Sequence, residues 1–417
     1  MSLSAPRLVR RAPGQQIAAR HSARRHGVGF WLIASAFVTA MAFSTVPTPL
    51  YPLYQARDGF STFTVTIVFA VYALGVLASL LLAGHISDWV GRRKVLITAL
   101  TLELVAAALF LTQPSLPLLL LARLVTGLGV GMLTATATAH LHDLHTAHRP
   151  DASPQRFEIV STAANIGGLG FGPLIAGLLA QYLDAPLRLP YLVFGALLLI
   201  SIAAVALTPE TVQVQSVRPA YRPQRITTDH GDPAGYLAAA AAGFASFAVF
   251  GLFTSLAPGF VGHTLHHPSR ALAGLTVFAV FGASAAAQTL TSRLDATLRR
   301  NIGLYAQAAG ATALAIGMHT ASLTLFLVAG ITAGIGAGVL FKSAVGTVVA
   351  MATPAKRGEA LAGLFLISYL GLALPAIAIG IATRYTTMTT AMTWFTAVLL
   401  ALLTTAGLLA RRPSHTD

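Results

Sequence analysis

Two ionisable residues interrupt runs of the chain that are otherwise apolar. Glu103 lies nine residues after Lys94, about 13 Å into a helix that starts there, and Arg123 lies inside the run 116–139. Charged groups away from water usually face a cavity or a partner. A carboxyl group near a fixed cation can take up and release a proton, so we expect Glu103 and Arg123 to act together in proton transfer. The alternatives are a neutral, hydrogen-bonded Glu103 and an Arg123 that reaches the membrane surface.

A polar hinge, residues 84–94, separates two apolar runs, 63–83 and 95–111. The hinge contains two glycines, one carboxylate and three adjacent cations: Gly84, Asp88, Gly91, Arg92, Arg93 and Lys94. The carboxylate can cap a helix N-terminus or pair with an arginine. We expect Gly84 to admit a neighbouring helix and Gly91 to permit a tight reversal of the chain.

A third pattern is rich in glycine and lies inside an apolar run. It contains Gly168, Gly172, Pro173 and Gly177. Proline removes a backbone donor and kinks a helix, while glycines let helices pack closely. The pattern therefore predicts a bent, tightly packed helix.

Two further groups of polar residues have weaker signals. Lys342 lies near the end of its run, where a lysine either contacts a substrate or extends to the surface. Four histidines and one aspartate follow the fourth run: His140, His142, Asp143, His145 and His148. They could bind a metal or sense pH, but we expect a solvated loop.

The composition requires a membrane environment for these elements. Hydrophobic residues make up 55% of the chain and charged residues only 10%, far below the share of about 25% in soluble domains. Mean hydropathy is +0.72. The runs are continuously apolar and long enough to span a bilayer, which favours helices over a β-barrel. The absence of cysteine excludes disulfides and thiol chemistry.

The sequence predicts twelve spans in two halves of six. The first six are 30–50, 63–84, 95–111, 116–139, 157–182 and 189–207, and the last six are 236–257, 272–290, 302–318, 323–341, 360–383 and 388–410. The predicted organisation is a disordered basic tail (1–27), an N-terminal bundle (28–207), a proline-rich linker (208–234), a C-terminal bundle (235–411) and a short tail (412–417). The segment 292–300, which has an aspartate near an arginine pair, repeats the hinge in the second half.

The distribution of cations predicts the orientation. With both termini inside, 21 of the 27 lysines and arginines fall on cytoplasmic segments, as the positive-inside rule expects. The net charge of +14 is therefore better explained by topology and anionic lipid headgroups than by nucleic acid. An organellar transit peptide at the N-terminus is the alternative to a lipid-facing tail. We expect a multi-pass protein of a bacterial inner or plasma membrane.

The hinge resembles the loop G-x-x-x-D-[R/K]-x-G-[R/K]-[R/K] of the major facilitator superfamily, with Trp89 in place of one cation. In that family this loop locks and unlocks the inner gate. The stretch that starts at Arg123 resembles the family's fourth-helix pattern R-x-x-x-G-x-G-x-[GA], in which the arginine tunes a proton-carrying acid. The glycine-rich run resembles the element G-x-x-x-G-P-x-x-[GA]-G of twelve-helix drug:proton antiporter-like exporters, with Ala176 where glycine is usual.

The resemblance implies an all-α membrane protein with two pseudo-symmetric six-helix bundles. It predicts a transporter that works by alternating access and exports small amphipathic or apolar compounds in exchange for protons. Its partners would be a small-molecule substrate, protons and the lipid bilayer, with no cofactor, metal or nucleic acid, and it would be a monomer. An importer or uniporter of a sugar or other metabolite is the first alternative. A membrane-embedded transferase is the second, although it would need clustered intramembrane acids or histidines, which the spans lack apart from Glu103.

Overall fold

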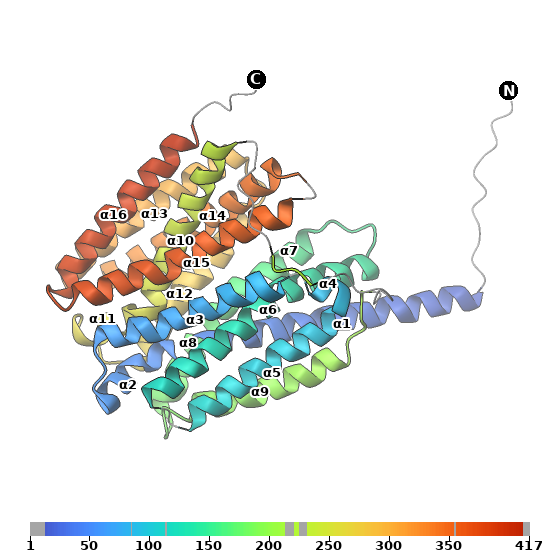
Figure 1. Ribbon diagram of the computed structural model, residues 1–417, viewed down its shortest axis with the longest axis horizontal. Helices are drawn as coiled ribbons and strands as arrows, with labels where there is room; N and C mark the ends of the chain where they lie inside the picture. The colour runs from blue at the N-terminus through green and yellow to red at the C-terminus, as the bar shows by residue number, and fades with distance from the viewer. Residues whose placement is uncertain are drawn as a thin grey trace.

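The structure, a computed structural model, describes residues 13–84, 86–112, 115–212, 221–224, 232–353 and 356–411, with the side chains of the first helix described from Arg24 onward. All the regular secondary structure in these ranges is helical. The helices form two bundles that lie side by side, drawn in blue to green and in yellow to red in Figure 1.

The first bundle contains six long helical passages and several short turns. Its elements are α1 (Pro13–Thr45), η1 (Thr48–Leu50), α2 (Tyr51–Asp58), α3 (Thr62–Ala83), α4 (Ser87–Val90), α5 (Arg92–Leu111), α6 (Leu116–His148), α7 (Gln155–Thr162), η2 (Ala163–Gly167), α8 (Gly168–Tyr182) and α9 (Leu189–Ala206). The chain passes from α7 to α8 through η2, which is a single turn of π-helix.

The second bundle repeats this plan with fewer interruptions. Its elements are α10 (Pro233–Ser255), α11 (Ala257–His263), α12 (Arg270–Leu290), α13 (Ala296–His319), α14 (Leu323–Met351), α15 (Arg357–Ala382) and α16 (Met388–Leu409). Hydroxyl side chains cap several of these helices, because Ser269, Ser322 and Thr387 each accept a hydrogen bond from a backbone N–H three residues later. Such caps satisfy backbone donors that hydrocarbon cannot.

The predicted spans all fall on helices of the structure. Eleven described helices are long and apolar enough to cross a membrane. The predicted ninth span, 302–318, lies within α13, which is not among the eleven. α13 nevertheless packs along α14 as a full member of the bundle. The fold is therefore the expected all-α membrane fold, with a count close to twelve.

The N-terminal boundary differs from the prediction. Residues 13–27 were expected to belong to a disordered tail, but α1 begins at Pro13, and its first turns project beyond the rest of the bundle in Figure 1. The rest of that predicted tail, 1–12, and the short tail 412–417 lie outside the described residues, as do 213–220 and 225–231 of the linker.

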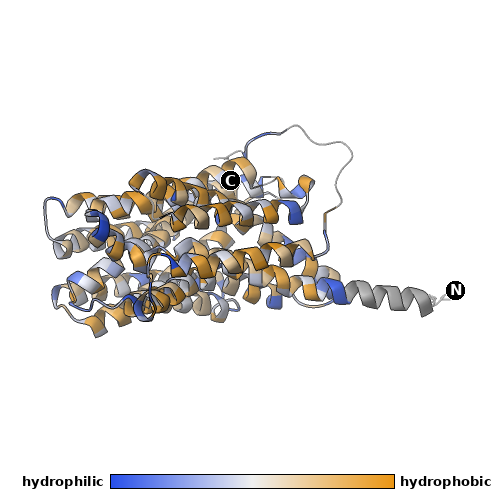
Figure 2. Ribbon diagram, turned by 90° about the horizontal axis from the view of Figure 1, so that it is seen from below, coloured by the Kyte–Doolittle hydropathy of each residue, from blue (hydrophilic) through white to orange (hydrophobic). Residues whose placement is uncertain are grey.

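Apolar side chains cover the outer faces of both bundles. Large apolar residues that are more than half exposed include Leu74, Ile200, Val328 and Val398. Hydrophilic residues gather toward the two ends of the helices in Figure 2, where the bilayer headgroups would lie. This arrangement is that of a protein whose solvent is lipid.

The two bundles meet along two pairs of helices, α3 with α15 and α8 with α12. We call the end of the molecule at which α9 ends and α10 begins the linker end; it also carries α4. The opposite end carries α2 and α11. At the linker end, the backbone N–H of Gln224 and the hydroxyl of Tyr221 donate hydrogen bonds to the carbonyls of Leu81 and Leu82. The linker is thus attached to the end of α3.

Candidate transport cavity and hinge network

A small cavity of about 70 Å³ lies between the two bundles. Helices of both halves contribute to its wall, as a binding site shared by two moving halves requires. The residues that line it are Met41, Thr45, Thr48, Phe69, Tyr72, Arg123, Thr134, Asn165, Ile166 and Leu169 from the first half, and Phe247, Phe250, Thr254, Phe281, Phe341, Phe365, Tyr369 and Leu372 from the second.

The wall from the first half carries most of the polar groups. Thr45 and Thr134 donate their hydroxyl hydrogens to backbone carbonyls, which leaves their oxygens able to accept. Asn165 lies on the π-helical turn η2, a type of turn that is frequent at functional sites. Arg123 adds the charge.

The wall from the second half is mainly aromatic. The ring of Phe247 lies 4.9 Å from that of Phe341 and 5.2 Å from that of Tyr369, and Phe250 stacks on Phe281 at 4.8 Å. Offset and edge-to-face contacts of this kind hold the rings in fixed positions. The second half therefore presents a preformed apolar surface to the cavity.

Arg123 is held inside the first bundle and does not reach the membrane surface. Only 2% of its surface is exposed. Its Nη1 donates a hydrogen bond to the carbonyl of Ser44 at 2.8 Å, and its guanidinium carbon lies 4.4 Å from the centre of the Tyr72 ring. Its Nε is buried without a hydrogen-bond partner. The alternative in which Arg123 extends outward does not describe this structure.

Glu103 is fully buried, and neither of its carboxylate oxygens has a hydrogen-bond partner. It packs against α6 where Gly129 leaves room, since a Cβ on Gly129 would lie 2.9 Å from the Cγ of Glu103. Among the described residues no ion pair joins Glu103 to Arg123. The two residues, which we expected to act together in proton transfer, are therefore not in direct ionic contact in this conformation, and Glu103 does not line the cavity.

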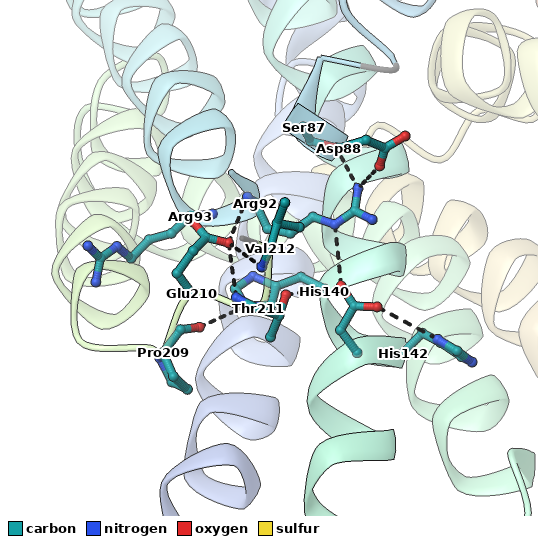
Figure 3. Close-up of polar contacts among 11 residues, drawn as sticks. Ser87, Asp88, Arg92, Arg93, His140, His142, Pro209, Glu210, Thr211 and Val212 are labelled. Carbon is teal, nitrogen blue, oxygen red and sulfur yellow. Dashed lines mark hydrogen bonds and ion pairs between the residues drawn. The ribbon is translucent and has the colours of Figure 1, made fainter. Parts of the chain in front are cut away.

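The hinge forms a polar network at the linker end, shown in Figure 3. Arg92 is its centre: Nη1 donates to Asp88 Oδ1 and to Ser87 Oγ at 2.7 Å, and Nε donates to Asp143 Oδ2 at 3.4 Å. Asp143 also accepts a hydrogen bond from Thr211 Oγ1 at 3.0 Å. The predicted pairing of Asp88 with Arg92 is present, and it is connected to α6 and to the segment after α9.

Glu210 closes this network from a distant part of the sequence. Its carboxylate accepts hydrogen bonds from the backbone N–H groups of Arg92 and Arg93, both at 3.0 Å. These N–H groups at the start of α5 have no partner within the helix, and a negative charge is favourable there. Gly91 precedes them with φ +109°, a conformation that suits glycine, and a Cβ there would lie 2.7 Å from Glu210 Oε2.

Other hinge residues have smaller roles in this structure. The three atoms nearest to a Cβ built on Gly84 all belong to Leu80 of the preceding turn, so the close approach expected there does not involve a second helix. Lys94 is exposed in the first turn of α5. Arg93 Nη1 donates to the carbonyls of Ala206 and Thr208, each at 3.4 Å, which joins the hinge to the end of α9.

The histidine group lies on the last turns of α6, which extends to His148, and not on the loop that we expected. His140 Nε2 contacts the carbonyl of Pro209 at 3.1 Å and His145 Nε2 that of Ser153 at 3.2 Å. His142 Nδ1 lies 3.9 Å from Asp143 Oδ1. In the described part of the chain, no group of three histidines or acids could hold a metal ion.

The glycine-rich helix α8 lies between α1 and α12. A Cβ on Gly168 would lie 2.8 Å from the Cβ of Met41, and one on Gly172 would overlap the carbonyl of Ala42. Pro173 and Gly177 face the other bundle instead, because a Cβ on Gly177 would overlap the carbonyl of Arg270, and one on Gly274 that of Pro173. The two bundles therefore touch backbone to backbone on the side toward the opposite end.

Lys342 does not line the cavity. Its Nζ donates a hydrogen bond to the carbonyl of Gln288 at 2.8 Å, between α14 and α12. The sequence had allowed a substrate contact for Lys342, but in the structure this side chain contacts a neighbouring helix instead.

Several residues of these sites were missed by the sequence reasoning. Glu210 could have been found, because it belongs to Thr208-Pro209-Glu210-Thr211 after the sixth span, a pattern that is common in the family that the hinge resembles. Asn165 and the aromatic wall around Phe247 had no such signal, since such residues are ordinary within apolar spans. Only the packing of the two halves brings them to one cavity.

The fold and the shared cavity define a membrane transporter. Comparison with known families agrees: the sequence profile of the Major Facilitator Superfamily matches residues 32–317. The chain belongs to this superfamily. Membership points to a transporter that moves a small-molecule substrate, and away from an enzyme.

One relative and two solved structures show how far the similarity extends. An uncharacterized MFS-type transporter of Mycobacterium tuberculosis, Rv1250, is 26% identical over 151 residues, which span 36% of this chain and only 25% of that protein. The crystal structure of the human organic anion transporter MFSD10 (TETRAN) has a TM-score of 0.66 at 15% identity and covers 91% of this chain and 99% of its own. A POT family transporter crystallised with 5-aminolevulinic acid has a TM-score of 0.73 at 10% identity, covering 93% and 96%. These structures establish the fold.

Proposed function

We propose that this protein is a secondary active transporter that works by alternating access and exports small amphipathic or apolar compounds in exchange for protons. The observation that carries the proposal is the cavity between the bundles, with an aromatic wall on one side and a buried arginine on the other. A cavity shared by two bundles can open to either side of the membrane when one bundle rocks against the other.

The buried acid supports the choice of protons as the coupling ion. Glu103 is enclosed among helices of the first bundle, and neither of its carboxylate oxygens has a hydrogen-bond partner. A proton can therefore bind to this carboxyl group without breaking a hydrogen bond to another group of the protein. Buried intramembrane carboxyls commonly serve as proton relays. Arg123 lies one helix away on α6, and its positive charge would influence whether the carboxyl group of Glu103 holds a proton as the bundles move. We assign proton coupling to these two residues.

The hinge network supports the gating step. Asp88, Arg92 and Glu210 hold α4, α5 and the segment after α9 together at the linker end. We assign this end to the cytoplasm, as the positive-inside rule favours. Both termini would then lie on the cytoplasmic side of a bacterial plasma membrane. Gly84, Gly91, Arg93 and Lys94 complete this gating loop, and Gly168, Gly172, Pro173 and Gly177 form the antiporter-like helix. The chain would work as a monomer, because each monomer contains a complete cavity.

Transport by the purified protein in proteoliposomes tests this proposal. A set of fluorescent naphthalene derivatives of differing charge serves as the substrate probes, and an imposed pH gradient as the driving force. We expect probe and protons to move in opposite directions, with Asp88→Asn and Arg123→Ala each abolishing transport. The control is Asp184→Asn, an exposed carboxylate outside the cavity and hinge, which should transport normally.

The same assay decides against the proposal when its outcome differs. Uptake of probe together with protons would identify an importer, and transport unaffected by the pH gradient a uniporter. Full activity of both Asp88→Asn and Arg123→Ala would remove these residues from the gate and the coupling site.

A further inference from the structure

The central cavity has a one-sided charge. Among the described residues that line it, Arg123 is the only one with a formal charge, and none is a carboxylate. The acid that could neutralise Arg123, Glu103, makes no ion pair with it and does not line the cavity. The cavity therefore presents a cation without its counter-ion.

Arg123 also has unused hydrogen-bonding capacity. A guanidinium offers five N–H donors, and the structure gives this one a single hydrogen bond, to the carbonyl of Ser44, in addition to the face of the Tyr72 ring. Its Nε is buried and has no partner. A buried cation in this condition is unfavourable unless a ligand completes its coordination.

The opposite wall selects for a different part of a ligand. The six aromatic side chains contributed by the second half are Phe247, Phe250, Phe281, Phe341, Phe365 and Tyr369. Such rings bind apolar and aromatic groups by burial and by stacking. The faces of these rings carry partial negative charge and do not favour an anionic group. A ligand that satisfies both walls therefore has an apolar end at the rings and a polar end at Arg123.

We infer that the transported compounds are aromatic or apolar molecules that carry an anionic group, and that organic cations are excluded. The inference rests on the proposed transport function and narrows its substrate class. The anionic group, a carboxylate or sulfonate, would accept hydrogen bonds from Arg123, which matches such groups with a planar, two-pronged donor. The apolar part would lie against Phe247 and its neighbouring rings.

The exclusion of cations follows from the same geometry. A cationic ligand would be attracted to the faces of the aromatic rings. In a cavity of this size it would also lie close to Arg123 in an environment that screens charge poorly, and no lining carboxylate would offset that repulsion, which is the larger effect. Neutral compounds would bind through the aromatic wall alone. The expected order of affinity is therefore anion, neutral compound, cation.

Binding to the purified full-length protein in detergent tests this order. The probes share one ring system: 2-naphthalenesulfonate, 2-naphthylmethanol and (2-naphthylmethyl)trimethylammonium, measured by equilibrium dialysis and naphthalene fluorescence. We expect the sulfonate to bind at least about tenfold more tightly than the trimethylammonium compound. Binding is measured because Arg123 is also assigned to proton coupling, which would confound a transport assay of its variants.

Substitution of Arg123 locates the effect. Arg123→Gln should weaken binding of the sulfonate about tenfold while binding of 2-naphthylmethanol changes less than about twofold, which also shows that the variant is folded. The affinity of Arg123→Lys for the sulfonate should lie between those of the wild type and Arg123→Gln, since lysine retains the charge but not the planar fork. Lys342→Gln removes another intramembrane cation that does not line the cavity and should leave binding of all three probes unchanged.

The outcomes separate this inference from the proposed function. Equal or tighter binding of the trimethylammonium probe, or sulfonate binding that survives Arg123→Gln, overturns the anion assignment. If wild-type proteoliposomes transport the cation against a pH gradient but not the sulfonate, the exporter stands and the substrate class is wrong. If none of the three probes is bound or transported, both proposals fall.

Discussion

The two bundles have similar helices but place different groups at corresponding points. On the third long helix of each half, a buried polar side chain faces a glycine of the next long helix: Glu103 on α5 faces Gly129, and Gln307 on α13 faces Gly336. Both side chains are fully buried. Gln307 Nε2 donates a hydrogen bond to the carbonyl of Ala245 at 2.6 Å, whereas neither oxygen of Glu103 has a partner.

The helix starts that follow the two hinge-like loops differ in the same way. α13 is capped locally, because Asp295 Oδ1 accepts hydrogen bonds from the N–H groups of Thr297 and Leu298 at 2.9 Å. α5 is capped by Glu210, from beyond the end of the bundle's last helix. A local cap moves with its helix, whereas a distant cap can be made or broken when elements move.

This difference indicates a division of labour between the halves. The first half holds the unpartnered acid, the buried arginine and the long-range cap, which are the groups able to change state. The second half holds a glutamine anchored through its amide nitrogen, a local helix cap and the aromatic wall, which are suited to remain rigid.

Replacement of the acid should have the largest effect. Glu103→Gln makes this position resemble that of Gln307 and removes the proton site, so transport driven by a pH gradient should fall at least about a hundredfold. Exchange of substrate at equal pH should persist. Proteoliposomes containing the dye pyranine would report proton movement.

The matched control lies in the other half. Gln307→Ala should reduce thermal stability because it removes a buried hydrogen bond, yet leave the ratio of protons to substrate unchanged. Normal proton-driven transport by Glu103→Gln would show that the carboxyl group plays no part in coupling, and the comparison of the two positions would lose its functional meaning.

The contact between the halves provides the second test. Gly274→Ala would place a methyl group against the carbonyl of Pro173 and prevent α12 from reaching α8. Transport should fall about thirtyfold, the equivalent of an overpacking penalty near 2 kcal/mol. Gly282→Ala, on the same helix, meets nothing within 4 Å and should transport as the wild type does. Equal activity of the two variants would mean that this close contact is not part of the transport cycle.

The distant cap should have an intermediate effect. Glu210→Gln weakens the charge interaction with the start of α5, and transport should fall about tenfold as the linker-end network loosens. Asp295→Ala removes the local cap of α13 and should lower the free energy of unfolding by about 1 kcal/mol with little change in transport. Thermal unfolding and transport of both variants, measured together, check the contrast. A stability loss without a transport defect in Glu210→Gln would make the two caps equivalent.

The aromatic wall should have the smallest effect on rate. Phe247→Ala removes a ring that contacts Phe341 and Tyr369, and the Michaelis constant for an aromatic substrate should rise about fivefold with little change in maximal rate. Leu74→Ala, on the exposed apolar surface, is the control and should leave the Michaelis constant unchanged. A fall in maximal rate alone would place Phe247 outside the substrate site.

Much of the architecture could be predicted from the sequence. Long apolar runs can cross a bilayer only as helices or closed barrels, so composition and run length were enough for the class and the approximate number of spans. The hinge was also visible, because charged residues between two such runs must lie outside hydrocarbon. Its Asp88–Arg92 pair is local, four residues apart, and the structure contains it.

Contacts between distant segments could not be predicted in the same way. Glu103 and Arg123 both lie inside apolar runs, but the sequence could not show which groups surround them. The rotation of α5 and α6 about their axes places Glu103 at Gly129 and Arg123 at Ser44 and Tyr72. Glu210 reaches Arg92 across more than a hundred residues. The aromatic wall forms through the packing of four helices of the second half. α10, α12, α14 and α15 bring one ring each to the same surface: Phe247, Phe281, Phe341 and Phe365.

Composition and run length along the chain are enough to show that lipid surrounds a set of helices, because hydrophobic burial and the satisfaction of backbone hydrogen bonds depend on them. Which buried groups meet depends on the packing of the helices, because helix rotation and the docking of the two bundles rest on contacts between residues far apart in the sequence. The charge and shape of the cavity follow from that docking.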